Sequence, residues 1–160
     1  MKLNNTFKLI ISILIPVGIG VISGLFTAAN VKTWFVTVAK PSFNPPSWIF
    51  APVWTTLYVM MGIAFFLVWK NENVQKSVKQ KAIILFAIQM LLNFFWSFIF
   101  FQQHEIGWAL VDIILLWIFI ILTIFSFAPI SKTAAWLLVP YISWVSFATI
   151  LNFAIWQLNR

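Results

Sequence analysis

The sequence predicts an all-α integral membrane protein, a bundle of five transmembrane helices with a Pro/Trp-rich first loop as a lid. The chain has 160 residues, of which 62% are hydrophobic and only 8% are charged. It holds five continuous apolar runs without lysine or arginine, each near the roughly 20 residues that cross a bilayer as a helix. We therefore expect residues 1–160 to form one transmembrane domain, with helices over residues 9–29, 47–69, 82–101, 107–128 and 134–156.

The first predicted helix carries two signals besides its length. Gly20 and Gly24 have GxxxG spacing, which lets a second helix backbone approach closely. Such a contact serves either a dimer or a helix of the same bundle. Pro16 lies in the middle of this helix, where it removes a backbone donor and should kink the span.

The second helix is preceded by a loop over residues 30–46 and by an unusual stretch, KPSFNPPSWIFAPVWTTLY, at residues 40–58. The prolines of this stretch fix φ and remove backbone donors, which predicts a rigid, non-helical approach to the helix. Ser47 is the expected N-cap. Trp48 and Trp54 either form the wall of a binding pocket or anchor the helix end at the membrane surface.

The remaining helices follow one another through short connections, at residues 70–81, 102–106 and 128–133. Short loops predict that sequence neighbours pack antiparallel. Pro140 lies within the fifth apolar run. It should interrupt the hydrogen-bond ladder of that helix and free the carbonyl of Trp136.

The formal net charge is +7, and the basic residues are distributed unequally between the two ends of the predicted bundle. Such an excess predicts the cytoplasmic side, so we expect a cytoplasmic N-terminus and an outer C-terminus in a bacterial cytoplasmic membrane. Scattered lysines without a soluble module indicate contacts with membrane lipid and no nucleic-acid partner. The more basic end has Lys2, Lys8, Lys70, Lys76, Lys79, Lys81 and Lys132, and the other end has Lys32, Lys40 and Arg160.

Several kinds of chemistry are excluded by residue types. The chain has no cysteine and a single histidine, His104, so thiol catalysis is absent and no metal site is expected. No Ser-His-Asp set, carboxylate pair or phosphate-binding loop occurs. Asp112 is the only acid inside an apolar run. It serves either a structural role, satisfied by neighbouring polar groups, or a functional one as proton relay or counter-charge.

Polar and aromatic residues recur at helical spacing within one layer below the first loop. Residues three or four apart share a helix face, and the small Ala148 between larger neighbours leaves space for a flat ligand. Each pair taken alone is also compatible with ordinary packing, but their common depth favours a pocket. The sets are Trp54 with Tyr58, Asn93 with Trp96, Trp108 with Asp112, and Trp144 with Ala148 and Asn152.

These residues lie in segments that resemble the TspO/MBR family, which includes tryptophan-rich sensory proteins and the mitochondrial translocator protein, also known as the peripheral benzodiazepine receptor. The matching segments are KPSFNPPSWIFAPVWTTLY, LLNFFWSFIFF (91–101), GWALVDIILL (107–116) and PYISWVSFATILNFAIW (140–156). The resemblance implies a homodimeric five-helix bundle with a ligand pocket under the first loop. Its implied ligand-binding residues are Trp34, Phe35, Pro45, Trp54, Tyr58, Asn93, Trp96, Trp108, Trp144, Ala148 and Leu151.

The resemblance also implies the ligand class. We expect a membrane receptor or sensor for porphyrins such as protoporphyrin IX and for other flat lipophilic molecules, with no cofactor. Two alternatives remain: a light- and oxygen-dependent porphyrin-degrading enzyme with Trp54 and Trp144 as catalytic residues, or a transporter of porphyrins and other lipophiles. The family's sterol motif is not satisfied, because Phe153 stands where it requires tyrosine and Arg160 lies too far beyond. Sterol binding is not expected.

Overall fold

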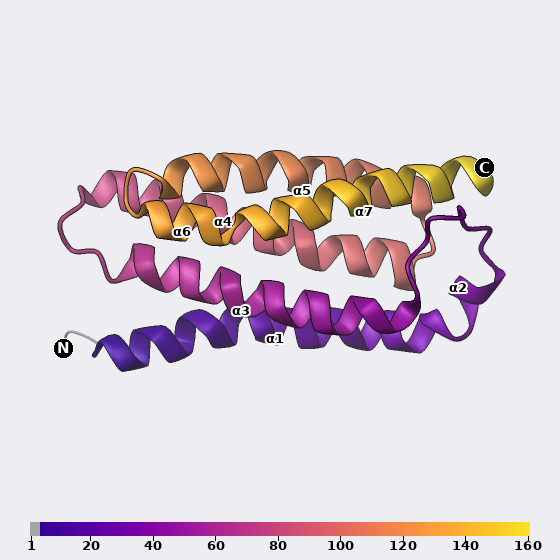
Figure 1. The fold of residues 1–160 in the computed structure, drawn as a ribbon, viewed down its shortest axis with the longest axis horizontal. Coiled ribbons are helices and arrows are strands. Elements are labelled where there is room, and N and C mark those ends of the chain that lie inside the picture. The colour runs from indigo at the N-terminus through magenta and orange to yellow at the C-terminus, as the bar shows by residue number, and fades with distance from the viewer. Residues whose placement is uncertain (1–3) are drawn as a thin grey trace.

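The computed structural model describes residues 4–160 and confirms an all-helical bundle (Figure 1). Five helical segments in this range are long and apolar enough to cross a membrane. Three of the five are composite. A 3-10 turn at Ser47–Ile49 leads directly into α3, α4 continues into a π-helical turn at Phe98–Gln102, and α6 is followed directly by α7. The helices are α1 (Asn5–Val31), α2 (Trp34–Thr37), α3 (Phe50–Trp69), α4 (Lys76–Ser97), α5 (Ile106–Phe127), α6 (Lys132–Leu137) and α7 (Val139–Leu158).

The long helices run side by side along the length of the molecule (Figure 1). One end of the bundle carries the start of α1, the α3–α4 connection and α6. The other end carries α2, the α4–α5 turn and the C-terminus. The loops therefore alternate between the two ends as the sequence predicts. Lys2, counted with the more basic end, lies outside the described residues.

The interior of the bundle combines apolar packing with a few amides and one acid. Met61, Ala64 and Val145 are fully buried, while many large apolar side chains of the long helices face outward, as expected for contact with lipid. The buried polar side chains include Gln89 and Asn93. Burying such groups is costly unless they are hydrogen-bonded, so they point to organised interior contacts.

Several helix boundaries differ from the sequence predictions by a few residues, and three of the differences have a local physical reason. The fifth helix is divided, because Pro140 lies at the start of α7, where a missing N–H costs nothing. Ser47 does not cap α3, since it begins a 3-10 turn, Ser47–Ile49, and its side chain makes no capping hydrogen bond. The helix predicted from residue 82 begins at Lys76, because lysine and glutamine are good helix formers that apolar-run length does not detect.

The crossing of α1 and α3 depends on glycine. A Cβ atom built on Gly62 would lie 2.6 Å from Ile13 Cα and 2.8 Å from Ser12 O of α1. A Cβ on Gly20 would overlap the ring of Tyr58, whereas one on Gly24 meets no described atom within 4 Å. Gly20 therefore serves a contact within the bundle. α1 continues through Pro16 as a single helix.

Candidate functional site

A cavity of about 540 Å³ lies inside the end of the bundle that carries the first loop. Its walls come from α1, α3, the end of α4 and α7, together with the two ends of the first loop. This volume falls within the range of about 300–1,000 Å³ that small-molecule sites occupy. The cavity therefore has a size that suits a small-molecule ligand, and it lies at the end of the bundle where the sequence predicts a binding pocket.

Aromatic rings form much of the cavity wall. Trp54 of α3 stacks on Tyr58 one turn further along, with ring centroids 5.5 Å apart and planes 28° apart. Trp96 stacks on Phe100 at 5.4 Å, and Trp144 of α7 contacts another lining residue, Phe50, edge-on at 5.9 Å. Large flat walls of this kind suit a flat apolar ligand, because aromatic faces bury much area in a defined geometry.

The α1 side of the cavity is lined by small residues and is open. Gly20, Gly24 and Ala28 follow one another at four-residue intervals along this wall. Gly24, Ala28 and, on the facing α3, Thr55 are all exposed on the surface of the bundle. This side of the cavity therefore opens onto the flank of the bundle.

A chain of buried hydrogen bonds closes the inner end of the cavity. Tyr58 Oη donates to Asn93 Oδ1 at 2.6 Å, and Asn93 Nδ2 donates to Tyr141 Oη at 3.0 Å. Tyr141 Oη in turn donates to Gln89 Oε1 at 2.9 Å. These bonds join α3, α4 and α7, so the polar layer fixes the positions of the helices that carry the aromatic walls.

Two indole N–H groups of the cavity wall have contrasting surroundings. Trp96 Nε1 donates to Asn152 Oδ1 at 2.9 Å, and Asn152 Nδ2 donates to the Ile106 carbonyl at 3.0 Å. Trp144 Nε1 is buried and has no hydrogen-bond partner among residues 4–160. Buried donors without a partner are rare and often mark functional positions.

The structure brings most of the predicted ligand-binding residues together. Asn93 does not line the cavity itself, but it accepts a hydrogen bond from Tyr58, which does. Of the two tryptophans in the Pro-rich stretch, Trp54 lines the cavity, while Trp48 is 73% exposed at the surface. The predicted residues that line the cavity are Phe35, Trp54, Tyr58, Trp96, Trp144, Ala148 and Leu151.

Three predicted residues lie elsewhere. Trp108 is 68% exposed on the outer face of α5, a helix that contributes no residue to the cavity wall. Trp34 stacks on His104 with ring centroids 4.2 Å apart and thereby joins the first loop to the α4–α5 turn. Pro45 lies near the end of the loop, two residues before the 3-10 turn, where it is half-buried and does not line the cavity.

Asp112 does not reach the cavity either. It is buried on α5, and its Oδ2 has no hydrogen-bond partner in the described part of the chain. Trp108 and Asp112 share the predicted spacing, but the first faces outward and the second faces the bundle interior. The pair is therefore not a ligand-binding unit.

The α1 wall was not predicted from the sequence as part of the site. Its residues Gly24, Thr27 and Ala28 are small and carry no chemical signal of ligand binding. The spacing of Gly20 and Gly24 indicated only a helix contact. Lys32, at the end of α1, also lines the cavity, although its position in the sequence suggested only a loop charge.

The first loop is held at this end of the bundle by the C-terminus. Ala39 N donates to Asn159 Oδ1 at 3.0 Å, and Asn159 Nδ2 donates to the Ala39 carbonyl at 2.9 Å. Phe35 and Val38 add a small apolar cluster with residues of α5 and α7. Apolar packing thus holds the first part of the loop, and hydrogen bonds to Asn159 hold its middle.

Asn159→Ala should loosen the first loop without unfolding the bundle. The substitution removes both hydrogen bonds to Ala39 in the loop, together with one to the Ile155 carbonyl within α7. A net loss of about 1 kcal/mol at the loop corresponds to about fivefold more frequent opening. Amide hydrogen exchange at residues 38–40 should accelerate by that factor in Asn159→Ala. Gln157→Ala is the matched control, because Gln157 is exposed and its side chain makes no hydrogen bond within residues 4–160. Equal exchange in both variants would contradict the role assigned to Asn159.

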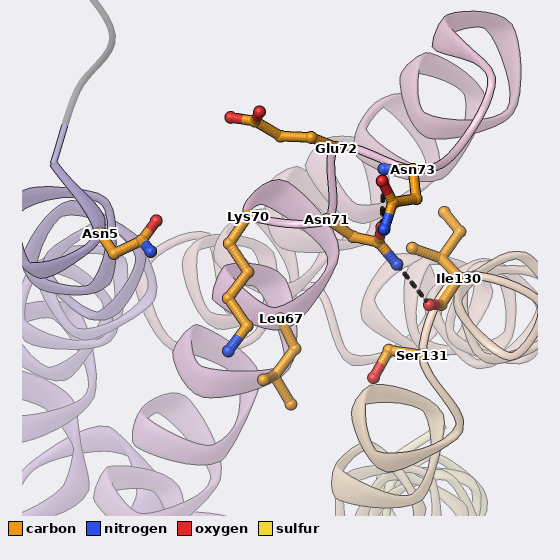
Figure 2. Close-up of a pocket in the computed structure, with 8 residues that line it drawn as sticks. All are labelled: Asn5, Leu67, Lys70, Asn71, Glu72, Asn73, Ile130 and Ser131. Atoms are coloured by element: carbon orange, nitrogen blue, oxygen red, sulfur yellow. Dashed lines mark hydrogen bonds between the residues drawn. The ribbon is translucent and has the colours of Figure 1, made fainter.

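A second hollow, of about 610 Å³, lies at the opposite end of the bundle (Figure 2). Its wall is mainly polar, and its described lining residues include no aromatic side chain. Asn71 Nδ2 donates to the Ile130 carbonyl at 2.9 Å and Asn71 Oδ1 accepts from Asn73 N at 3.0 Å (Figure 2). The first bond joins the α3–α4 connection to the α5–α6 connection, and the second lies within the α3–α4 connection. The hollow does not resemble a site for a lipophilic ligand.

Comparisons with known proteins agree with the membrane fold. The sequence model of the TspO/MBR family matches residues 12–157. The chain is 48% identical over 158 residues to "Tryptophan-rich protein TspO" of Chlorobaculum tepidum, which covers 96% of each chain. It is 40% identical over 130 residues to "Translocator protein" of Homo sapiens, covering 79% of this chain and 75% of that one.

A third relative is "Tryptophan-rich sensory protein" of Cereibacter sphaeroides, 33% identical over 126 residues, covering 79% of this chain and 77% of the relative. The matches span nearly all of the five helices, and the five apolar helices are those of an integral membrane protein. Together they support a role as a membrane receptor or sensor. This chain belongs to the TspO/MBR family.

Proposed function

We propose that this protein is a membrane receptor or sensor that binds protoporphyrin IX and related flat lipophilic molecules. The observation that carries the proposal is the cavity of about 540 Å³ walled by Trp54, Trp96 and Trp144. Ligand sites are mostly apolar with a few placed polar groups, and this cavity has that character. Membership of the TspO/MBR family supports the receptor or sensor role.

The geometry supports a planar ligand in particular. The rings of Trp54 and Trp144 belong to walls on two different helices, α3 and α7, and small residues of α1 complete the enclosure. A planar ring system lying between such walls buries both faces, which a compact aliphatic molecule cannot do. The opening toward the lipid-facing side provides access for a ligand that partitions into the membrane.

We also propose how the protein is oriented in the membrane and what surrounds it there. We place the cavity end on the outer side of a bacterial cytoplasmic membrane, with the N-terminus cytoplasmic and the C-terminus outside. The excess of lysine at the opposite end supports this orientation, because cytoplasmic loops are enriched in basic residues. We also propose a homodimer in contact with membrane lipid, which the outward apolar surface of the helices supports.

The test is a titration of the detergent-purified protein with protoporphyrin IX in the dark, followed by quenching of tryptophan fluorescence. Saturable quenching at a ratio of one ligand per chain is the expected result. Quenching that rises without saturation, or that saturates far from a ratio of one ligand per chain, would contradict a defined site.

A second candidate function is light-dependent degradation of the bound porphyrin with molecular oxygen as the oxidant. The observation that favours it is the presence of indoles at the cavity, including Trp144, whose buried Nε1 lacks a partner in residues 4–160. Indoles are readily oxidised side chains and would lie beside an excited ring. For this activity we propose Trp54 and Trp144 as the catalytic residues.

Trp144→Phe distinguishes the two candidates. Under illumination in air, the enzyme hypothesis predicts that the wild type converts protoporphyrin IX to a new absorbing species and that Trp144→Phe does not. Trp108→Phe is the matched control, because Trp108 lies on the outer face of α5. Loss of the porphyrin spectrum at the same rate without protein would eliminate the enzyme hypothesis and leave the receptor.

A further inference from the structure

The cavity has one charged residue at its mouth. Among the described residues that line it, Lys32 alone carries a charge. Lys32 directly follows Val31, the last residue of α1, and its side chain is exposed. An otherwise apolar and aromatic cavity thus presents a single ammonium group at the end nearest the first loop.

Lys32 makes no ion pair within residues 4–160. The chain contains three acids, Glu72, Glu105 and Asp112, and no ion pair or side-chain hydrogen bond involves Lys32 within residues 4–160. Glu72 pairs with Lys8 at the opposite end of the bundle at 3.7 Å. The positive charge at the cavity mouth is therefore available to a ligand.

The other two basic residues at this end are engaged. Lys40 Nζ donates to the Val38 carbonyl at 2.8 Å and lies 4.6 Å from the centroid of the Phe35 ring. The guanidinium of Arg160 lies 5.5 Å from the Trp156 ring. Neither Lys40 nor Arg160 lines the cavity. Lys32 differs from both in its position and in its lack of a partner among the described residues.

A structural explanation exists for a lysine at this position. A cation at the C-terminal end of a helix interacts favourably with the helix dipole, and Lys32 is the C-cap residue of α1. That explanation requires only the charge and predicts no effect on ligand choice. The helix-dipole explanation does not account for the position of Lys32 in the cavity wall. Ligand-binding measurements therefore distinguish the helix-dipole role from a role in ligand selection.

We infer that Lys32 is a specificity-determining residue that selects flat lipophilic ligands bearing a carboxylate. The ring system of such a ligand occupies the aromatic part of the cavity, and its carboxylate pairs with the ammonium group at the mouth. Protoporphyrin IX has this chemistry, because two propionate groups extend from one edge of its ring. The inference rests on the proposed function, since it concerns the same cavity, and it adds the charge and the orientation of the ligand.

The strength of such a pair depends on its surroundings. Lys32 lies at the surface of the bundle, where hydrogen bonds to charged groups retain part of their value and salt weakens them. We therefore expect a contribution of about tenfold in affinity, which equals about 1.4 kcal/mol. The contribution should diminish as salt is raised, whereas the contribution of the aromatic walls should not.

The experiment compares two ligands and four proteins. Wild type, Lys32→Gln, Lys32→Arg and the control Lys40→Gln are titrated in one detergent with protoporphyrin IX and with its dimethyl ester, which lacks the carboxylates. For each ligand, the affinity of a variant is divided by that of the wild type, so that differences in detergent partitioning cancel. Lys32→Gln should bind the free acid about tenfold more weakly and the ester unchanged. Lys32→Arg and Lys40→Gln should match the wild type for both.

The possible failures are distinguishable. If Lys32→Gln weakens both ligands equally, the residue acts on the fold and the specificity role is overturned. If Lys32→Gln binds both ligands as the wild type does, the carboxylate is held elsewhere and the inference is again overturned, while the proposed function stands. If neither ligand binds the wild type saturably, the proposed function fails and the inference fails with it.

Discussion

Replacing Ala148 with leucine is expected to lower the affinity for protoporphyrin IX by about tenfold to a hundredfold, since overfilling a packed site costs about 1–3 kcal/mol. Ala148 lines the cavity from α7 and is only 8% exposed. Trp144 and Asn152 lie one turn to either side and also line the cavity. A leucine side chain would therefore project into the space that the proposed ligand occupies.

The control for this prediction lies on the same helix. Ala154 is also on α7, is half-buried and does not line the cavity, so Ala154→Leu should bind as the wild type does. Tryptophan-fluorescence titrations of both variants, with unfolding temperatures measured in parallel, separate loss of the site from loss of the fold. A folded Ala148→Leu protein that binds protoporphyrin IX with wild-type affinity would show that the ligand lies elsewhere.

Gly62→Ala is expected to lower the stability of the bundle, because Gly62 of α3 packs directly against the backbone of α1. A Cβ atom at this position would lie 2.6 Å from Ile13 Cα and 2.8 Å from Ser12 O. These are backbone atoms, which a rotamer change cannot move. The helices must separate, and we expect a cost of about 1–3 kcal/mol in the free energy of unfolding.

Gly18→Ala provides the matched control, because a Cβ on Gly18 meets no described atom within 4 Å. Alanine favours helix more than glycine does by up to about 1 kcal/mol, so this variant should be as stable as the wild type or slightly more stable. Thermal unfolding in detergent, followed by circular dichroism, measures both. A Gly62→Ala protein as stable as Gly18→Ala would mean that α1 and α3 do not cross at Gly62.

The fold was largely predictable because a membrane imposes a strong length requirement on apolar helices. Five apolar runs without basic residues give five spanning segments. The boundaries were less predictable, since they depend on local backbone chemistry. Pro140 divides the last segment into α6 and α7. Ser47 begins a 3-10 turn where a helix cap was expected.

The candidate site was predictable where aromatic residues combine with helical spacing. Trp54 with Tyr58 and Trp144 with Ala148 share helix faces, and these faces line the cavity. The same rule misplaced Trp108, because spacing identifies neighbours on a helix but not which face turns inward. The α1 wall could not be predicted, because residues such as Gly24 contribute to the cavity by leaving space and carry no aromatic or polar group that would indicate a site.

The most direct test of the central claim is an experimental structure of the protein with protoporphyrin IX bound. We expect the ring to lie between Trp54 of α3 and Trp144 of α7, with α1 along its open side and its propionate edge toward Lys32. A porphyrin bound instead on the outer surface of the helices, or in the polar hollow beside Asn71, would contradict it.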